Sequence, residues 1–396
     1  MKKHMYLFAI FTVTLCFLGT SAFAQIDIFG KINSAVDKKT DEAIDDAMNP
    51  KKKEEQKKED EKKNDASNTS AAGKAVNSPQ TIKAYNNYDF KVGDNIIFED
   101  LFAGDQDGEF PAHWNLENGQ AVVNKVNGEP AFLLTDGNYV LVAPRMKTES
   151  YLTDPFTIEF DYYQANSNQW GPMIRFFEAE ENKNHDLHFG HEVSTTYFPH
   201  DLSGSTLGSD DEYFGKWHHG AVSYKNGQLK AYVDNIRALV VPHTDFVPVR
   251  VQIGGIGEPN NAITFRNFRI ASGGDQNMIG KMLTDGKFVT HGITFDVGKA
   301  TLKPESMGVL NDVAKFMKDN SSAKFEIDGH TDSDGDAAKN QKLSEDRASS
   351  VKSQLVTMGI DASRFTTKGF GAAKPLGPND SPEAKANNRR VEFVKM

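Results

Sequence analysis

The chain has 396 residues, which is long enough for two domains of ordinary size with additional segments. Acidic residues outnumber basic residues by 55 to 45, and the net charge of −10 argues against nucleic acid as the main partner, because phosphate binding needs an excess of positive charge. The single cysteine excludes an internal disulfide framework and a zinc site built from cysteines.

The N-terminus has the pattern of an export signal. Two lysines precede the apolar run Met5–Leu18, and small residues follow, the last of them Ala24. This pattern predicts a secretory signal peptide over residues 1–24. Cys16 lies inside the apolar run without the small residues that a lipidation signal places before its cysteine, so we expect cleavage after Ala24 and a mature chain without cysteine.

Two polar segments follow the signal. Residues 25–50 are predicted to form an amphipathic helix, because apolar side chains recur at helical spacing before Pro50. Such a helix either stands alone, partly formed, or serves docking or self-association, and the sequence does not separate these alternatives. Residues 51–92 are predicted to be a charged flexible linker, since Lys51–Lys63 contains only Lys, Glu, Asp and Gln.

Residues 93–273 have the pattern of an all-β domain. Aromatic and apolar residues alternate with polar ones over Phe156–Tyr162, which predicts a half-buried strand. Asn226-Gly227 lies between two alternating runs and predicts a hairpin. The alternation changes parity between Phe265 and Phe268, which predicts a β-bulge. Many short strands without a long helical pattern favour a two-sheet sandwich.

Parts of this region resemble the concanavalin-like (laminin-G and pentraxin) sandwich. The similar segments are Phe98–Phe102 with Trp114, then Gly215–His219 and Leu229–Asn235. The resemblance implies an all-β jelly-roll fold and a surface that binds a glycan or a protein, although a fold alone does not determine function.

One strand of the sandwich invites an enzymatic alternative. Glu159, Asp161 and Gln164 resemble the Glu-x-Asp-x-x-Glu strand of laminarinase-type glycoside hydrolases. A retaining hydrolase needs two carboxyl groups across the sugar bond, and Gln164 cannot supply the proton. We therefore expect a binding module rather than an enzyme. Three acids could coordinate calcium, but an acidic turn is the favoured interpretation and no metal site is predicted: Asp105, Asp107 and Glu109.

The C-terminal region changes from the all-β pattern to alternating strands and helices. Gly292–Asp296 is predicted to be a strand, and Pro304 begins a helix. A strand follows at Phe325–Ile327, and then a helix that ends at Gly359. A third strand, a short helix and a final strand complete a β-α-β-α-β order with additions, which predicts an α+β domain over residues 280–396.

This region resembles the peptidoglycan-binding C-terminal domain of the OmpA and MotB type. The residues that carry the resemblance are Phe295-Asp296, Leu302-Lys303-Pro304, Gly329-His330-Thr331-Asp332, Gly335, Asn340, Leu343-Ser344, Arg347-Ala348, Gly359-Ile360, Arg364, Gly369-Phe370-Gly371, Pro375 and Asn388–Glu392.

The resemblance implies a receptor for diaminopimelate, the zwitterionic amino acid of the peptidoglycan stem peptide. Carried over from the family, Asp332 would bind the ammonium group and Arg347 the carboxylate, for which a planar guanidinium is suited. Thr331, Asn340 and Arg389 would be supporting contacts. The alternative is that Asp332 and Arg347 form only a structural salt bridge. No catalytic residue, cofactor or metal ligand is implied, and His330 is expected to be a packed turn residue.

These features together predict an exported, non-enzymatic envelope protein of a Gram-negative-type cell, located in the periplasm or at the outer membrane. Its C-terminal domain would bind diaminopimelate-containing peptidoglycan, and its sandwich would present a second binding surface. The N-terminal helix would reach another partner, with the outer membrane as one candidate. The rival hypothesis is an envelope glycoside hydrolase that uses the C-terminal domain as its anchor.

Overall fold

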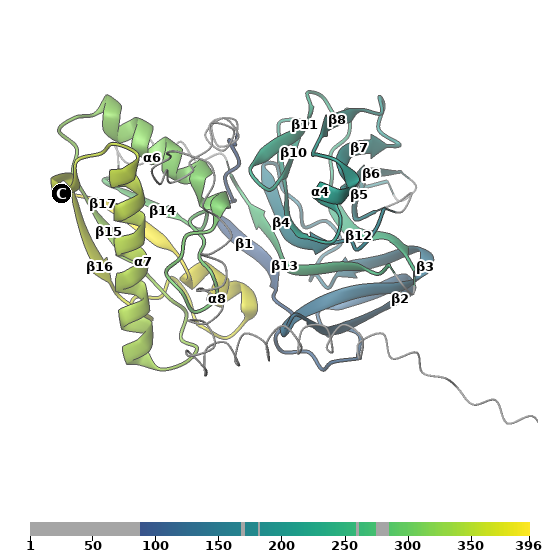
Figure 1. The fold of residues 1–396 in the computed structure, drawn as a ribbon, viewed down its shortest axis with the longest axis horizontal. Helices are drawn as coiled ribbons and strands as arrows, with labels where there is room; N and C mark the ends of the chain where they lie inside the picture. Colours follow the sequence, from purple (N-terminus) through teal and green to yellow (C-terminus); the bar gives the residue numbers. More distant parts are fainter. Residues whose placement is uncertain (1–87, 168–170, 181–182, 259–260, 275–284) are drawn as a thin grey trace, which may run out of the picture. The chain divides into compact units, whose positions relative to one another are not determined.

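The computed structural model describes residues 88–167, 171–180, 183–258, 261–274 and 285–396. The predicted signal peptide, the predicted amphipathic helix and most of the predicted linker lie outside these residues. The described residues form two β-sheets, each with its own hydrophobic core, within a unit that spans residues 77–396 (Figure 1). No helix within the described ranges combines the length and the apolar character needed to cross a membrane.

The larger, 13-stranded sheet has the order β11-β10-β9-β4-β13-β3-β12-β5-β6-β7-β8, with β1 also paired to β13 and β2 to β3. Its elements are β1 (Asn95–Asp100), β2 (Trp114–Val126), β3 (Glu129–Pro144), β4 (Phe156–Tyr163), β5 (Met173–Phe177), β6 (Asn184–His188), β7 (Glu192–Thr196), β8 (Ser203–Thr206), the short helix α4 (Asp210–Tyr213), β9 (Trp217–Lys225), β10 (Gln228–Val233), β11 (Ile236–Val241), β12 (Arg250–Gly257) and β13 (Ile263–Ser272).

The long strand β3 connects two parts of this sheet. Its first half pairs with β13, where Phe132 lies opposite Phe265, and its second half pairs with β12, where Val142 lies opposite Ile253. Gly137, with a φ of 145°, lies between the halves, and strands that switch partners at such bends let a sheet fold over on itself. Strand β11 accordingly lies against β7 and β8. The strands enclose one core, but in one hydrogen-bonded path rather than in the two separate sheets that the sequence predicted.

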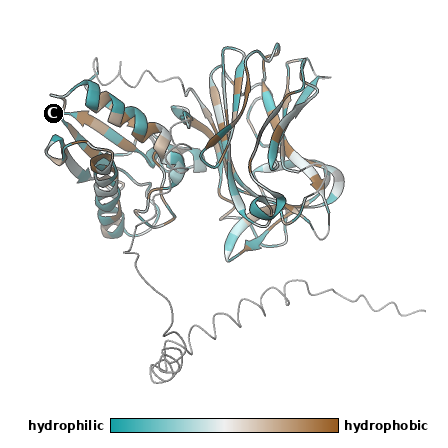
Figure 2. Cartoon of the chain, turned by 45° about the horizontal axis from the view of Figure 1, so that its top comes forward, coloured by the Kyte–Doolittle hydropathy of each residue, from teal (hydrophilic) through white to brown (hydrophobic). Residues whose placement is uncertain are grey.

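Local sequence signals account for much of this region. Asn226 and Gly227 form the turn between β9 and β10 with φ angles of 50° and 74°, a conformation that favours these two residue types. The register of β13 against β4 shifts between Arg266 and Arg269, which confirms the predicted bulge. Figure 2 shows hydrophilic and hydrophobic residues alternating along several strands.

Strand β4 differs from the half-buried strand that the alternation predicts. Its apolar residues enter the core, but Glu159 and Asp161 on the other face are only 5% and 7% exposed. Charged side chains cover them, because Arg269 and Arg266 of β13 form ion pairs with these carboxylates. A period of two identifies the polar face of a strand, but it does not reveal what covers that face.

Residues 88–92 also differ from the prediction, which assigned them to the flexible linker. Tyr88 and Phe90 are each 3% exposed, and both rings contact Tyr232 edge to face at centroid distances of 5.5 and 5.3 Å. These residues belong to the folded structure, because their alternating apolar side chains are buried against other residues. The charged run Lys51–Lys63 has no apolar side chains that could be buried in this way.

The smaller, 4-stranded sheet has the order β14-β17-β15-β16, in which β15 and β16 are parallel and the other pairs antiparallel. Its elements are β14 (Lys287–Thr290), the 3₁₀ turn η1 (Pro304–Ser306), α6 (Met307–Asp319), β15 (Phe325–Gly329), α7 (Ala337–Thr357), the 3₁₀ turn η2 (Ala362–Arg364), β16 (Phe365–Gly369), α8 (Pro382–Asn388) and β17 (Val391–Lys395).

The strand predicted at Gly292–Asp296 is not present in the sheet; the edge strand is β14. The Gly292–Asp296 segment bonds elsewhere, since the Ser306 hydroxyl accepts from the Thr294 amide at 2.9 Å and the Lys303 amide donates to the Thr294 carbonyl at 3.0 Å. Ile293 of this segment is buried in the core of the smaller sheet, and Phe295 packs against that core, although the segment does not extend the ladder.

Helix α7 lies very close to the ends of β15 and β16. A Cβ atom added at Gly329 would lie 2.3 Å from the Ser344 carbonyl oxygen, and one at Gly369 would lie 2.5 Å from the Glu345 nitrogen. Only glycine permits this approach. The loop that follows β15 is thereby held next to α7, and this loop carries the predicted binding residues.

Candidate functional site

Asp332 lies in the loop between β15 and α7, which main-chain contacts hold in place. The Thr331 amide donates to the Gly371 carbonyl at 2.9 Å, and the Thr331 hydroxyl donates to the Asp332 carbonyl at 2.8 Å. One carboxylate oxygen of Asp332 accepts from the Asp334 amide at 3.1 Å. Thr331 therefore orients the loop, and the second carboxylate oxygen of Asp332 is directed to another partner.

Asn340, in the first turn of α7, secures the same loop. Its side-chain amide donates to the Asp334 carbonyl at 2.8 Å, with a longer contact of 3.4 Å to the Asp332 carbonyl. Asn340 thus stabilises the conformation of the loop that carries Asp332.

Arg347 projects from α7 without an acidic partner. Its Nε donates to the Lys299 carbonyl at 3.0 Å, and its guanidinium lies 5.0 Å from the centroid of the Phe295 ring. Burial lowers the pKa of Arg347, the nearby Arg389 lowers it further, and Asp332 opposes both effects. Among the described residues no carboxylate lies within 4.0 Å of its nitrogens, so its charge is available to an anionic ligand.

Arg389 follows α8 and spans two carboxylates. One of its terminal nitrogens donates to Asp332 at 2.6 Å, and the other forms an ion pair with Glu99 of β1. Asp332 is thus paired with Arg389 and not with Arg347, which differs from the structural salt bridge considered as an alternative. Planar guanidinium groups are well suited to hold two carboxylates at once.

A cavity of about 110 Å³ lies beside these groups. Its lining includes Arg347 and Arg389 from the C-terminal domain, together with the aromatic ring of Phe295. Arg269 of the larger sheet also lines it. Arg389 is already paired with Asp332 and Glu99, so Arg347 is the lining cation that is suited to an anionic group. Asp332 is not itself a lining residue but contacts the lining residue Arg389.

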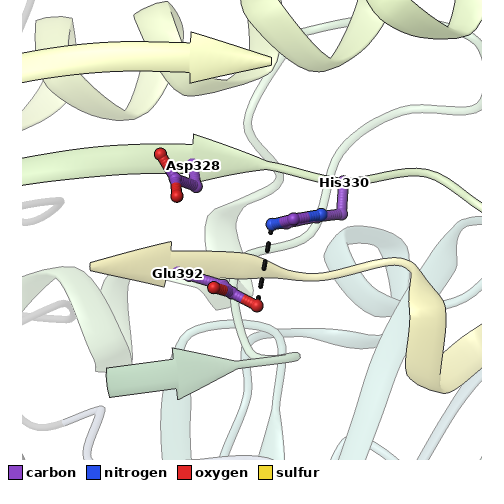
Figure 3. A group of neighbouring side chains, drawn as sticks. All are labelled: Asp328, His330 and Glu392. Carbon is purple, nitrogen blue, oxygen red and sulfur yellow. Dashed lines mark ion pairs between the residues drawn. The ribbon is translucent and has the colours of Figure 1, made fainter. Parts of the chain in front are cut away.

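A second group of titratable side chains is buried in the sheet nearby. Asp328 and His330 of the β15 region and Glu392 of β17 have ligand atoms within 4.8 Å of one another (Figure 3). Burial raises the pKa of Asp328 to about 6, with Glu326 and Glu392 contributing. Burial lowers the pKa of His330 to about 4, assisted by Arg390, so the imidazole is neutral at pH 7.

This cluster has the donor types of a metal site, but its surroundings do not favour one. Glu392 already accepts from Arg390 at 2.7 Å and pairs with Lys287 at 2.5 Å. A divalent cation would have to compete with these two fixed positive charges in a site of low polarity. His330 instead stacks on Phe370 at a centroid distance of 5.2 Å, as expected for a packed turn residue.

The carboxylates of β4 are bound within ion pairs. Burial raises the pKa of Glu159, although Arg269 opposes the rise. Burial would also raise the pKa of Asp161, but the hydrogen bond from His219 at 2.9 Å and nearby charges hold it well below its ordinary value. His219 itself has its pKa raised to about 9 by Asp161 and the neighbouring acids, against the effect of burial.

Two of the three acids considered as calcium ligands contact other residues of the protein. Asp105 accepts from the Ala112 amide at 2.9 Å, and Asp107 pairs with Lys125 at 3.4 Å. These contacts agree with an acidic turn.

Two residues near the cavity had no signal in the sequence. Glu99 and Arg269 lie on strands of the larger sheet, far along the chain from the motifs of the C-terminal region, and their carboxylate–guanidinium distance is 2.8 Å. No local spacing relates them to Asp332 or Arg347, so only the folded structure reveals their proximity.

Comparison with known proteins gives matches for the C-terminal region. Residues 294–389 match the model of the OmpA family. The probable lipoprotein YiaD of Escherichia coli (strain K12) is 45% identical over 102 residues, which are 26% of this chain and 47% of that protein. The peptidoglycan-binding protein ArfA of Mycobacterium bovis is 39% identical over 102 residues, 26% of this chain and 31% of that protein.

A crystal structure of a MotB-like protein from Desulfovibrio vulgaris is 30% identical, and the match covers 28% of this chain and 72% of that chain with a TM-score of 0.26. The matches span less than half the length of both curated relatives.

Proposed function

Residues 294–389 form an OmpA-family domain, and from this premise we propose that the chain binds peptidoglycan non-covalently through the diaminopimelate group of the stem peptide. The observation that carries the proposal is the charge arrangement beside the cavity. In the part of the chain that the structure describes, no acidic side chain pairs with the Arg347 guanidinium, and the Asp332 side chain is 14% exposed. The ligand has one ammonium and one carboxylate on adjacent atoms, which an acid and a guanidinium recognise together. The name of the relative ArfA supports the same ligand class.

Binding to purified sacculi tests this function. The full chain and its Asp332→Ala and Arg347→Ala variants are sedimented with sacculi, with Lys342→Ala as the control, because Lys342 is on the same helix and 69% exposed. We expect both pocket variants to remain in the supernatant and the control to sediment like the original protein. Arg347→Lys should rescue little, since an ammonium cannot form two parallel hydrogen bonds to a carboxylate.

Circular dichroism shows whether each variant is folded. Sedimentation of a folded Asp332→Ala, Arg347→Ala double variant at the level of the original protein would contradict the proposal.

We propose further that the larger sheet is a concanavalin-like jelly-roll binding module and not a hydrolase. The ion pairs of Glu159 with Arg269 at 3.5 Å and of Asp161 with Arg266 at 3.2 Å support this, because they occupy both carboxylates that a hydrolase would use. Gln164 stands where the general acid would be required. Incubation of the full chain with a panel of β-glucans should release no reducing sugar, and any release that Glu159→Gln abolishes would favour the hydrolase.

The cell envelope is the proposed location. The export signal in the sequence supports it, as does the description of YiaD as a probable lipoprotein. Within the envelope, residues 25–50 would contact a further partner, either the outer membrane or a second copy of this chain. Light scattering of chains with and without these residues separates the two, because only self-association changes the mass.

A further inference from the structure

We propose that the larger sheet completes the peptidoglycan pocket, with Glu99 as a positioning residue that sets the charge of Asp332 through Arg389. This inference rests on the proposed function and extends it to a residue outside the OmpA-family segment. It makes the peptidoglycan pocket a composite of both sheets instead of a property of the C-terminal domain alone.

The first observation is a chain of ion pairs that leaves the pocket and enters the larger sheet. Asp332 accepts from Arg389 at 2.6 Å, and Arg389 also pairs with Glu99. Glu99 in turn accepts from Arg269 at 2.8 Å, and Arg269 contacts Glu159 at 3.5 Å. Acidic and basic side chains alternate along this series of ion pairs, so each charge in the series lies next to charges of the opposite sign.

The second observation is that two hydrogen bonds between β1 and α8 hold Glu99 next to Arg389. Strand β1 carries Ile96 and Glu99, and the end of α8 carries Asn387, two residues before Arg389. The Asn387 side chain accepts from the Ile96 amide at 3.0 Å and donates to the Ile96 carbonyl at 2.9 Å. This paired contact fixes β1 relative to α8, and the ion pair of Glu99 with Arg389 follows from it.

Buried apolar side chains reinforce the same contact. A cluster around β1 and the preceding segment includes Ala386 of α8, and its other members are Tyr88, Phe90, Val92, Ile96, Ala221, Tyr232 and Ala271. Lys91 also forms an ion pair with Asp312 of α6. A contact with both an apolar core and matched polar groups holds its charges in place.

The charge balance explains what Glu99 would do. Arg389 alone would neutralise Asp332 and leave a weak site for an ammonium group. Glu99 is 2% exposed and takes the other terminal nitrogen of Arg389, so this guanidinium is shared between two carboxylates and does not fully neutralise Asp332. Arg347 contacts the Lys299 carbonyl and the Phe295 ring, and no carboxylate of the described residues lies within 4.0 Å of its nitrogens. The pocket thus keeps a negative and a positive pole, as a zwitterionic ligand requires.

Glu99→Gln in the full chain tests this role, because glutamine keeps the shape and removes the charge. We expect roughly tenfold weaker binding of a diaminopimelate-containing stem tripeptide, the size expected for one charge-assisted interaction. The loss should be specific to the ammonium group. A tripeptide acetylated at the side-chain amine should bind the variant and the original protein equally. If Glu99 had only a structural role, Glu99→Gln would weaken the binding of both tripeptides to the same extent.

Glu129→Gln is the matched control, since Glu129 is an exposed glutamate of the same sheet. Should Glu99→Gln fail to fold, Glu99→Asp retains the charge but shortens the side chain, and its preference for the free amine over the acetylated amine should be smaller than that of the original protein and of the control. Unchanged or tighter tripeptide binding by a folded Glu99→Gln overturns the inference. If Asp332→Ala also binds sacculi normally, the proposed function itself fails; if Asp332→Ala alone loses binding, only the role of Glu99 is refuted.

Discussion

At the scale of single residues, the C-terminal domain separates charges that bind from charges that only pack. Arg347 has a guanidinium with no acidic partner among the described residues, whereas Arg390 is engaged by Glu392 at 2.7 Å and by the Lys374 carbonyl at 3.0 Å. Breaking a buried pair leaves an uncompensated charge, so such pairs fix structure and contribute little to recognition. The sequence places Arg389 and Arg390 side by side and both line the cavity, but it is Arg389 that pairs with Asp332, whereas Arg390 pairs with Glu392.

Asp328 gives a prediction for stability. The pKa of about 6 in the folded protein lies above the ordinary value of 3.8, so the folded state holds this proton more tightly than the unfolded chain. The stability contributed by Asp328 is therefore present below the ordinary pKa and is lost as the pH rises through the folded pKa. Asp328→Asn imitates the neutral form, and we expect it to be more stable than the original protein at about pH 7.5 but equally stable near pH 4.

Urea unfolding at both pH values measures this difference. His330 has the opposite pH dependence, but it is present in both proteins and its effect cancels in the comparison. Asp380→Asn, at an exposed position, is the control. A variant that is less stable than the original protein at about pH 7.5 would show that the ionised carboxylate stabilises the fold, contrary to this account.

At the scale of elements, the close packing of α7 on the sheet determines where the binding loop lies. Gly329→Ala would place a methyl group 2.3 Å from the Ser344 carbonyl, so helix and strand must separate. We expect a loss of about 1–3 kcal/mol in the free energy of unfolding, as for other overpacked positions. Because Asp332 lies three residues further along, sacculus binding should fall as well.

Gly377→Ala is the matched substitution, since nothing lies within 4 Å of the Cβ it would introduce. Urea unfolding and sedimentation with sacculi compare the two variants. Equal stability of the two would mean that α7 and β15 can separate freely, which the packing does not allow.

The elements also show how far sequence patterns reach. The hairpin at Asn226-Gly227 and the bulge before Arg269 were predictable, because turn chemistry and parity are local properties. The strand predicted at Gly292–Asp296 was wrong, because the hydrogen bonds of Thr294 to the η1 region decide its conformation and these partners are not visible in a local pattern. The β-rich and α+β halves follow from periodicity, while the joining of thirteen strands into one sheet depends on how β3 changes partners.

At the scale of the whole molecule, ion pairs join residues that lie far apart in the sequence. Arg269 and Glu99 are 170 residues apart in sequence, and Arg389 and Glu99 are 290 apart. No window of sequence relates such residues. The family resemblance of the sequence therefore predicts Asp332 and Arg347 as binding residues, but no local pattern indicates that Glu99 of the larger sheet pairs with Arg389 beside them.

Phe90→Ala tests whether the contacts of residues 88–92 with other parts of the fold contribute to stability. Phe90 is 3% exposed and contacts Tyr232, and its carbonyl approaches Gly308 of α6 so closely that a Cβ there would lie 2.2 Å away. Removal of a buried phenylalanine costs about 3–5 kcal/mol. We expect faster degradation of the variant in limited proteolysis and a lower unfolding midpoint in urea.

Val247→Ala, at a side chain that is 64% exposed, is the control and should behave like the original protein. Unaltered proteolysis and stability of Phe90→Ala would indicate that the segment at residues 88–92 does not join the two sheets.

The most direct measurement of the central claim is calorimetric titration of the full chain with two stem peptides. One contains diaminopimelate, and the other contains lysine, which has the ammonium but lacks the second carboxylate. We expect the original protein to prefer the diaminopimelate peptide and Arg347→Gln to lose this preference. Equal affinity of the original protein for both peptides, or an unchanged preference in folded Arg347→Gln, would contradict it.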